Sequence, residues 1–335
     1  MTKMKRNLKY MLKSVLLVLI VTGSVSCTKG NNPIVFENGI FPDTVVALSG
    51  INSEFDDYNV DLNTLSNLVP VVFSSNRNSS GGQFDLVQAG LAYSFNRTTG
   101  EFILQFEMTD DPFLLQLLTK TNTTGNDFGP YRLYSSVDGY EYMIVSSVND
   151  QGNLDFRFTK NLPYFGSSIP EVTGPFPATR LNSPSDDAYF CFNTSQDTAY
   201  YCSDSDGDFD ICMTKKEPSV SVDQWLKSEY ESPLLVDVIN SENNDKCPYV
   251  YKKYMVFASD RPGGFGGYDL YYSIFRNGRW GAPVNMGPYI NSASDEYRPV
   301  LTGDENFTNM YMVFSSNRPG GKGGFDLYFA GINMN

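Results

Sequence analysis

Apolar and polar residues alternate over short stretches of the chain, and each such stretch is followed by a glycine-rich turn and a second alternating stretch. The clearest copies of this unit lie at 72–86, 256–271 and 314–328. Alternation with a period of two predicts β-strands with one buried face. A unit of roughly 50 residues that repeats in this way is typical of a β-propeller blade. The pattern therefore predicts an all-β fold.

Acidic residues mark the beginning of each unit and allow the units to be counted. Each mark stands a few residues after an Asn-Ser phrase, or a weaker version of it, and opens a predicted strand: Asp57, Asp127, Asp187, Asp245 and Glu296. A further aspartate opens the strand after each turn: Asp85, Asp155, Asp210, Asp269 and Asp326. The sequence thus predicts a five-bladed β-propeller, with six blades as the alternative.

The two ends of the repeat region complement each other. The fifth unit stops after its third strand, whereas residues 44–50 have the pattern of a fourth strand and precede the first unit. Pairing of 44–50 with 325–331 would close the ring and leave no open sheet edge. We therefore expect closure by an N-terminal strand. Two insertions, at 113–118 and 222–227, have short helical patterns.

The N-terminus carries the marks of an export signal. Five basic residues precede an apolar run at 15–21 that is too short to span a bilayer. The small residues and Cys27 that follow resemble the lipobox of bacterial lipoproteins, whose cysteine carries acyl chains such as palmitate; an ordinary cleaved signal peptide is the alternative. The resemblance implies a signal peptide at 1–26. A tether at 27–43 would then connect Cys27 to a single propeller domain at 44–335, which the repeated units define. The resemblance also implies a lipid-anchored outer-membrane protein, with the side of the membrane undetermined.

The charge of the chain limits its partners. It has 25 Lys and Arg against 38 Asp and Glu, and removal of 1–26 would leave 20 basic residues and a net charge of −18. Such an acidic surface repels nucleic acid and anionic lipids. We therefore expect no nucleic acid, and membrane contact only through the lipid. The chain has no His and no C-x-x-C pair, which argues against zinc. Four cysteines are expected to be either disulfide-bonded or buried thiols: Cys191, Cys202, Cys212 and Cys247.

One long phrase carries a family resemblance. Residues 261–271 read Arg-Pro-Gly-Gly-Phe-Gly-Gly-Tyr-Asp-Leu-Tyr, and Asn-Gly-Arg-Trp at 277–280 and Pro-Val-Asn-Met-Gly at 283–287 follow. Together they resemble the TolB-like propeller repeat of Gram-negative envelope proteins, closely in the last two units, well in the first and loosely in the second and third. The best-known propeller of that family has six blades. The resemblance implies a propeller of the cell envelope but no particular activity, because propellers host many functions.

Residues that recur in every unit have a structural interpretation. Each aspartate after a turn is expected to accept backbone N–H groups of that turn, and Arg77, Arg261 and Arg318 are expected to pair with carboxylates. The five acidic marks allow two interpretations. They could line one mouth of the central channel and hold a cation or a basic ligand tail, or each could cap the turn into its strand, which we prefer.

The third unit departs from the repeat in its turn. Where the last two units have Arg-Pro-Gly-Gly, it has alternating carboxylates around a glycine, with Asp204, Asp206 and Asp208 as candidate calcium ligands. Ca²⁺ takes about six to eight hard oxygen ligands, which such a loop could begin to supply. The glutamate that completes an EF-hand loop is absent, so we prefer a solvated acidic turn and keep calcium as the alternative. No other cofactor is predicted.

No constellation for nucleophilic catalysis is visible, because without His a Ser or Cys nucleophile would lack its usual base. We therefore predict a non-catalytic scaffold that binds an envelope or outer-membrane protein partner, or else a glycan or peptide, on one face of the ring. Candidate anchors lie in non-repeated segments, since exposed aromatics are common contacts: Phe113, Tyr164, Phe165 and Trp225. The alternative is a glycan-active enzyme with carboxylates at the channel mouth, or a glycan-binding propeller.

Overall fold

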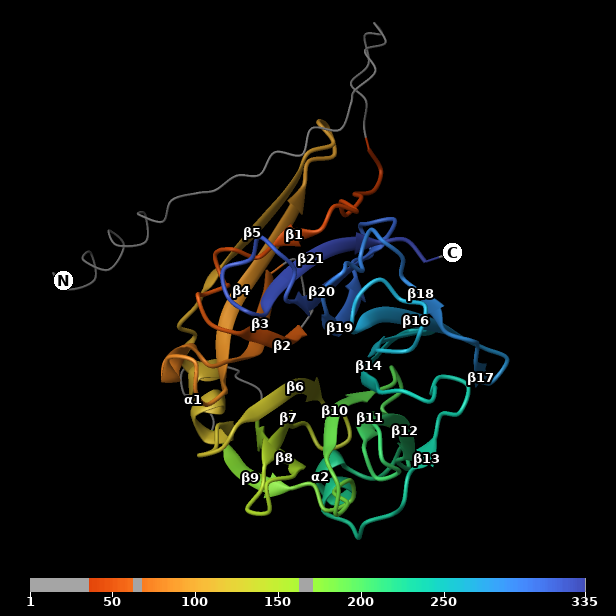
Figure 1. The fold of residues 1–335 in the computed structure, drawn as a ribbon. Coiled ribbons are helices and arrows are strands. Elements are labelled where there is room, and N and C mark those ends of the chain that lie inside the picture. The colour runs from red at the N-terminus through yellow and green to blue at the C-terminus, as the bar shows by residue number, and fades with distance from the viewer. Residues whose placement is uncertain (1–35, 63–67, 163–170, 335) are drawn as a thin grey trace, which may run out of the picture.

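Five antiparallel sheets stand around a common axis in the computed structural model, which describes residues 36–62, 68–162 and 171–334. The first strand of each sheet lies nearest the centre of the ring, and the later strands follow outward (Figure 1). The predicted all-β propeller with five blades is therefore confirmed, and the alternative of six blades is wrong.

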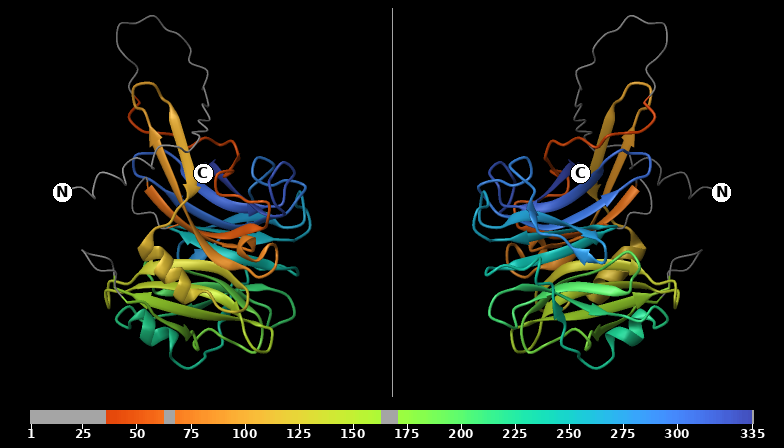
Figure 2. Two further views of the ribbon diagram at one scale, coloured as in Figure 1. Left: turned by 90° about the vertical axis from the view of Figure 1, so that its left-hand side faces the viewer. Right: turned by 90° about the vertical axis from the view of Figure 1, so that its right-hand side faces the viewer.

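The first two blades are regular four-stranded sheets with their strands in sequence order. Blade 1 consists of β2 (Asp57–Leu62), β3 (Leu68–Ser75), β4 (Asp85–Phe95) and β5 (Phe102–Met108). Blade 2 consists of β6 (Asp127–Tyr134), β7 (Glu141–Val148), β8 (Leu154–Asn161) and β9 (Thr173–Pro177). The hairpin formed by β4 and β5 projects well beyond the other strands (Figure 2).

The next two blades have short outer strands. Blade 3 consists of β10 (Asp187–Phe192), β11 (Thr198–Ser203), β12 (Asp210–Lys215) and β13 (Leu234–Leu235). Blade 4 consists of β14 (Asp245–Tyr251), β15 (Tyr254–Ser259), β16 (Asp269–Arg276), β17 (Arg279–Trp280) and β18 (Val284–Asn285). Both β17 and β18 pair with β16, so this blade has two short segments at its outer edge.

The N-terminal strand closes the ring, as the sequence predicts. Blade 5 takes its inner strands from the C-terminus and its outer strand from the N-terminus: β19 (Glu296–Gly303), β20 (Met310–Ser316), β21 (Asp326–Ile332) and β1 (Val46–Ala47). In the register of this pair, Val46 lies opposite Phe329 and Ala47 opposite Tyr328. The two ends of the propeller are therefore held in one sheet.

The asparagine of each Asn-Ser phrase joins neighbouring blades. The side chain of Asn52 donates to the carbonyl of Leu327 (3.0 Å) and accepts its N–H (2.9 Å), so it acts like an extra strand residue at the edge of β21. Asn291 makes the same two bonds to Leu270, at 3.0 and 2.8 Å. The same pair of bonds recurs at Asn122, Asn182 and Asn240.

Two α-helices of the described residues occupy the insertions predicted from the sequence, one between blades 1 and 2 and one between the third and fourth strands of blade 3. The helix α1 (Pro112–Thr121) begins at Asp111, whose carboxylate accepts the N–H of Leu114. One face of α1 buries Leu114, Leu117 and Leu118 against blades 1 and 2. The helix α2 (Val222–Leu226) begins at Ser221, whose hydroxyl accepts the N–H of Gln224.

The segment before β1 is part of the core, although the sequence places it in a tether. Phe41 is fully buried, and its ring stacks on that of Phe307 with 3.8 Å between centroids. Its N–H and carbonyl bind the side chain of Asn309 at 2.8 and 2.9 Å. The predicted boundary at 44 is therefore wrong, because the folded domain includes at least residues 39–43.

All four cysteines of the propeller are buried free thiols, so the disulfide alternative does not hold. Over the ranges that the structure describes, no helix is long and apolar enough to cross a membrane. The predicted signal peptide and Cys27 lie outside these ranges.

Phe41→Ala is expected to destabilise the propeller by about 3–5 kcal/mol, because it opens a cavity in a closely packed aromatic cluster. Unfolding in urea, followed by circular dichroism, measures the change. Phe36→Ala is the matched control, since Phe36 is 37% exposed, and a loss below about 1 kcal/mol is expected there. Equal small effects of both substitutions would show that the segment before β1 does not support the fold.

Candidate functional site

The five acidic marks are buried inside their own blades. In blade 1, one oxygen of Asp57 accepts the N–H of Ser53 (2.5 Å), and the other accepts the hydroxyl of Ser75 (2.5 Å). Arg77 completes the arrangement with an ion pair of 2.6 Å to the same carboxylate. These bonds tie the incoming turn and the end of the second strand to the start of the inner strand. The carboxylate is therefore occupied by donors of its own blade.

Blades 4 and 5 repeat this arrangement. Asp245 pairs with Arg261 at 2.5 Å, and Glu296 pairs with Arg318 at 2.9 Å. Each arginine is mostly buried, and each carboxylate is completely buried. A buried carboxylate is costly unless it is paired and hydrogen-bonded. The arginine that the sequence places two residues after each second strand supplies that charge.

Blades 2 and 3 lack the arginine. Asn149 and Ser205 stand at its position in the sequence, and no ion pair to Asp127 or Asp187 exists among the described residues. Both carboxyls still accept bonds from the preceding turn, including the Ser183 N–H at 2.6 Å. Burial raises the pKa of Asp127 and the pKa of Asp187 to about 6.

Asp210, at the start of the third strand of blade 3, also differs from its counterparts. In blade 4 the carboxylate of Asp269 accepts two backbone N–H groups of the turn and the side-chain amide of Asn285. One oxygen of Asp210 is buried without a partner among the described residues, as is one oxygen of Asp326 in blade 5, but the other oxygen of Asp326 accepts two N–H groups of its turn. Burial, and then the neighbouring carboxylates of Asp208, Asp245, Asp206 and Asp237, raise the pKa of Asp210 to about 6.

Asp187 and Asp210 lie in one row across blade 3. The register places Asp187 opposite Ser203, and Ser203 opposite Asp210. Residues in such a row point to the same face, and strands about 4.8 Å apart place the two Cα atoms roughly 10 Å apart. Two carboxyl groups whose pKa lies near 6 therefore share one face of the same blade.

The calcium loop expected from the turn of blade 3 is not formed. Asp204 accepts the N–H of Asp186 at 2.8 Å, which is the role that Asn76 plays toward Asp56 in blade 1. Asp206 is exposed at the tip of the turn. Across the described ranges, no three or more acidic or cysteine side chains are grouped so that they could hold a metal ion.

Aromatic side chains from different blades meet near the axis at the start of the inner strands. Tyr58 lies 5.8 Å from Phe128 and 5.7 Å from Phe325, measured between ring centroids, and these residues belong to blades 1, 2 and 5. We call the half-buried side chains at this end of the channel the mouth ring: Tyr58, Phe84, Phe128, Phe209, Lys246, Tyr268, Tyr297 and Phe325. The five acidic marks lie behind this ring and do not form it.

The channel beneath the mouth ring is filled by side chains. The third residue of every inner strand has a positive φ, and a register shift follows it: Asn59, Gly129, Tyr189, Cys247 and Arg298. Arg298 is completely buried and reaches from blade 5 to the carbonyl of Pro130 in blade 2 (3.2 Å). Asp61 and Arg132 form a further buried ion pair of 2.8 Å.

The predicted aromatic anchors do not form a common surface. Trp225 is buried between Phe190 and Phe192 and donates its indole N–H to the carbonyl of Lys215 (3.0 Å). The prediction of an exposed anchor at Trp225 is therefore wrong, because α2 uses this side chain to fill the outer core. Phe113 is half-buried on α1. Tyr164 and Phe165 lie outside the described residues.

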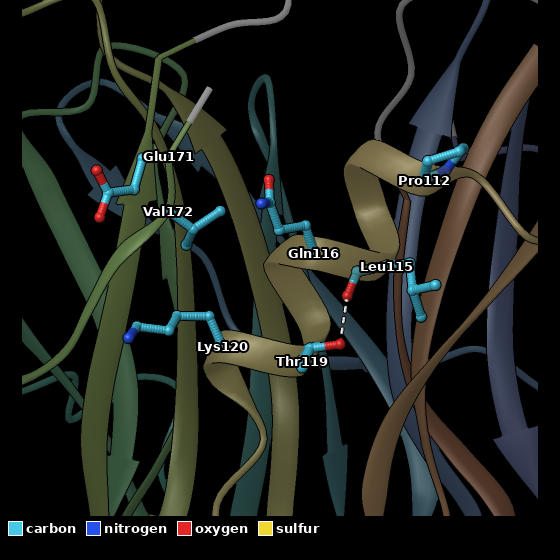
Figure 3. Close-up of a pocket in the computed structure, with 7 residues that line it drawn as sticks. All are labelled: Pro112, Leu115, Gln116, Thr119, Lys120, Glu171 and Val172. Atoms are coloured by element: carbon cyan, nitrogen blue, oxygen red, sulfur yellow. Dashed lines mark hydrogen bonds between the residues drawn. The ribbon is translucent and has the colours of Figure 1, made fainter. Parts of the chain in front are cut away.

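A groove of about 430 Å³ lies outside the ring, between α1 and residues 171–172. Figure 3 shows Gln116 and Lys120 of α1 opposite Glu171 and Val172. The lining contains one carboxylate and no aromatic side chain: Pro112, Leu115, Gln116, Thr119, Lys120, Glu171 and Val172. We therefore regard the mouth ring and the row in blade 3 as the candidate site.

No family model matches the chain, and no similar curated protein is found. Solved structures share its fold. The endo-arabinase from Bacteroides thetaiotaomicron has a TM-score of 0.53 at 11% identity, over 87% of this chain and 98% of that one. The GH43_1 enzyme from Xanthomonas citri has a TM-score of 0.54 at 9% identity, over 88% and 92%. An exo-1,5-α-L-arabinanase from a bovine ruminal metagenomic library has a TM-score of 0.51 at 10% identity, over 84% and 94%. At these identities the likeness establishes the fold.

These structures correct the functional interpretation of the sequence. The assignment to the TolB-like envelope lipoproteins is wrong, since the similar solved structures named above are those of an endo-arabinase, a GH43_1 enzyme and an exo-arabinanase. The prediction of a non-catalytic scaffold with an envelope protein partner fails with it. The glycan-active enzyme, named as the alternative, is the function that agrees with these neighbours. The outer-membrane location stays a prediction.

Asp127→Asn and Asp245→Asn are expected to differ in their effect on stability. The raised pKa of Asp127 means that its contribution to stability is present at low pH and is lost as the pH rises through about 6. Asp127→Asn should therefore reduce the loss of stability between pH 4.5 and 7. Asp245→Asn should cost about 3 kcal/mol at pH 7, because it leaves Arg261 without its carboxylate. Urea unfolding at several pH values tests both, and identical pH profiles of Asp127→Asn and wild type would contradict the account.

Proposed function

We propose that this chain is a glycan-active enzyme that binds a sugar at the mouth ring and cleaves it with carboxyl groups of blade 3. The observation that carries the proposal is the row of Asp187 and Asp210 beside this ring. The pKa of each is raised to about 6, and neither has an arginine partner among the described residues.

The mouth ring suits the binding of a sugar. Ligand sites are usually lined by aromatic and apolar side chains with a few polar groups that fix orientation. Tyr268 and Tyr297 lie 5.4 Å apart between centroids at nearly right angles, and each is partly exposed. Flat apolar faces of a sugar pack against such rings, while the tyrosine hydroxyls and Lys246 can bind sugar hydroxyls.

The carboxyls in blade 3 suit glycoside hydrolysis. That reaction needs one protonated carboxyl to donate to the leaving oxygen and a second carboxylate to activate water or attack the sugar. Carboxyls roughly 6.5–9.5 Å apart leave room for the water of an inverting enzyme, and the row across three strands is compatible with this range. Asp210 is partly exposed and follows Phe209 of the mouth ring, so we assign it the role of proton donor. Asp187 is buried beside it and is assigned the second role.

The absence of histidine does not oppose this chemistry. Two carboxyl groups suffice for the cleavage of a glycosidic bond, and burial alone can raise the pKa of a carboxyl group into the range that proton donation requires. The arginines of blades 1, 4 and 5 hold the corresponding carboxylates in ion pairs. Blades 2 and 3 lack this arginine, and blade 3 differs from blade 2 in that a second carboxyl with a pKa of about 6, Asp210, lies in the same row as the first.

Hydrolysis of arabinan, galactan and xylan oligosaccharides by the purified chain tests the proposal. Asp210→Asn and Asp187→Asn are each expected to lower kcat/KM by about 10²–10⁴-fold, with the activity of the wild type falling above pH 6 as Asp210 loses its proton. The matched control is Asp85→Asn, which changes the corresponding residue of blade 1 and should leave activity within about twofold.

Circular dichroism must show that each variant is folded. Activity that survives in both Asp187→Asn and Asp210→Asn would overturn the assignment of the two residues. Absence of hydrolysis and of binding across a wide glycan panel would overturn the proposed function itself.

A further inference from the structure

The mouth ring contains one cation, although the chain as a whole is strongly acidic. Lys246 comes from blade 4, and its ammonium nitrogen lies 3.8 Å from the ring centroid of Phe209 and 5.7 Å from that of Tyr268. No carboxylate of the described residues lies within 4.0 Å of this nitrogen. Its side chain is only half-buried. The ammonium is therefore held by aromatic faces and open to a ligand.

A second cation lies beneath the ring. Arg298 is completely buried, and two of its three guanidinium nitrogens, Nε and Nη1, have no hydrogen-bond partner among the described residues. Its third nitrogen donates to Pro130, and the guanidinium lies 5.7 Å from the ring centroid of Tyr189. The buried carboxylate of Asp61 offsets part of this positive charge, although Asp61 pairs directly with Arg132. Guanidinium nitrogens that are buried without hydrogen-bond partners are still costly, and an anion bound above them would reduce that cost.

The positive charges of Lys246 and Arg298 act on the same part of the channel. Both favour the ionised form of the Cys247 thiol, although burial, the larger effect, raises the pKa of this thiol to about 12. Cys247 follows Lys246 in the inner strand of blade 4. The positive charges of Lys246 and Arg298 therefore act together at Cys247, directly beneath the mouth ring.

Four aspartates near the mouth ring accept hydrogen bonds from their own or from neighbouring blades. Asp56 accepts the N–H of Phe325 (2.8 Å), Asp186 that of Leu154 (2.7 Å) and Asp295 that of Tyr268 (2.9 Å). Asp260 accepts the side-chain amide of Asn244 at 3.0 Å. The first three of these bonds join neighbouring blades, and the bond to Asp260 lies within blade 4. Among the side chains of the mouth ring, Lys246 is the one that carries a charge.

We infer that the glycan recognised at the mouth ring is anionic and carries a carboxylate or sulfate group that pairs with Lys246. Arg298 adds attraction from below, and the flat face of the sugar packs on Tyr268 and Phe209. This inference rests on the proposed function, because it names the class of glycan that the same site accepts. A charge-assisted bond in a partly buried, aromatic site is stronger than a neutral one.

Titration calorimetry with pairs of oligosaccharides that differ only in charge tests the inference. One pair is a galacturonan oligomer with free carboxylates and the same oligomer after methyl esterification. The second is a sulfated galactan oligomer before and after desulfation. The charged member of at least one pair should bind about tenfold tighter or more, and the preference should shrink as salt is raised from 0.05 to about 0.5 M.

Lys246→Gln should reduce this preference to less than about threefold, because it weakens the binding of the charged member much more than that of the neutral member. The matched control is Lys253→Gln, because Lys253 is also a lysine over a tyrosine ring, 5.2 Å from Tyr254, but is fully exposed in the turn at the other end of β14. It should bind like the wild type. Thermal unfolding confirms that both variants are folded.

The two proposals fail in different ways. Equal binding of charged and neutral members, or a preference that persists in Lys246→Gln, would overturn the anionic glycan and leave the proposed function intact. Binding only of neutral glycans would likewise overturn the anionic glycan and leave the proposed function intact. Binding of no glycan in the panel would overturn both.

Discussion

A buried carboxylate at the first residue of each inner strand is the interaction on which the propeller depends. It receives the N–H of the incoming turn and the hydroxyl at the end of the second strand, so one side chain fixes the position of three chain segments. In three blades an arginine balances the charge. The asparagine that precedes each inner strand then makes two side-chain hydrogen bonds to the backbone of the blade before it, and so attaches the strand to that blade. Removal of one such carboxylate would loosen a whole blade.

The same requirement explains where chemistry can be located. A carboxylate that pairs with an arginine and accepts hydrogen bonds from a turn is committed to structure. In blade 3 Asp187 has no arginine partner among the described residues and one oxygen of Asp210 has no hydrogen-bond partner there, and burial raises the pKa of both. The register places the two residues on one face. Their environment differs from the repeat because the turn between them differs in sequence. Departures from a repeat are therefore more informative about function than the repeat itself.

The fold could be predicted from the sequence to a large extent. Alternation, the acidic marks and the incomplete last unit were sufficient to predict five blades and closure by 44–50, because these features depend on local strand and turn geometry. The TolB-like phrase misled for the same reason. The Arg-Pro-Gly-Gly phrase forms a tight turn, and the following aspartate accepts the backbone N–H groups of that turn. A propeller with any function can have such a turn.

The candidate site could be predicted only in part. The aspartates of blade 3 were visible as a departure from the repeat, but the sequence suggested calcium there, since the row with Asp187 appears only in the register of the folded blade. The mouth ring was missed because its members lie in separate blades and meet only when the ring closes. Trp225 appeared exposed in a non-repeated segment, yet α2 folds it against blade 3. The only sequence signal for the ring was the aromatic residue next to most of the acidic marks.

The most direct test of the central claim is a titration of the aspartate carboxyl groups by carbon-13 nuclear magnetic resonance, with Asp187→Asn and Asp210→Asn used to assign the signals. The account predicts that the carboxyls of Asp187 and Asp210 titrate near pH 6. Titration of both Asp187 and Asp210 below about pH 4.5, as in unperturbed aspartates, would contradict it.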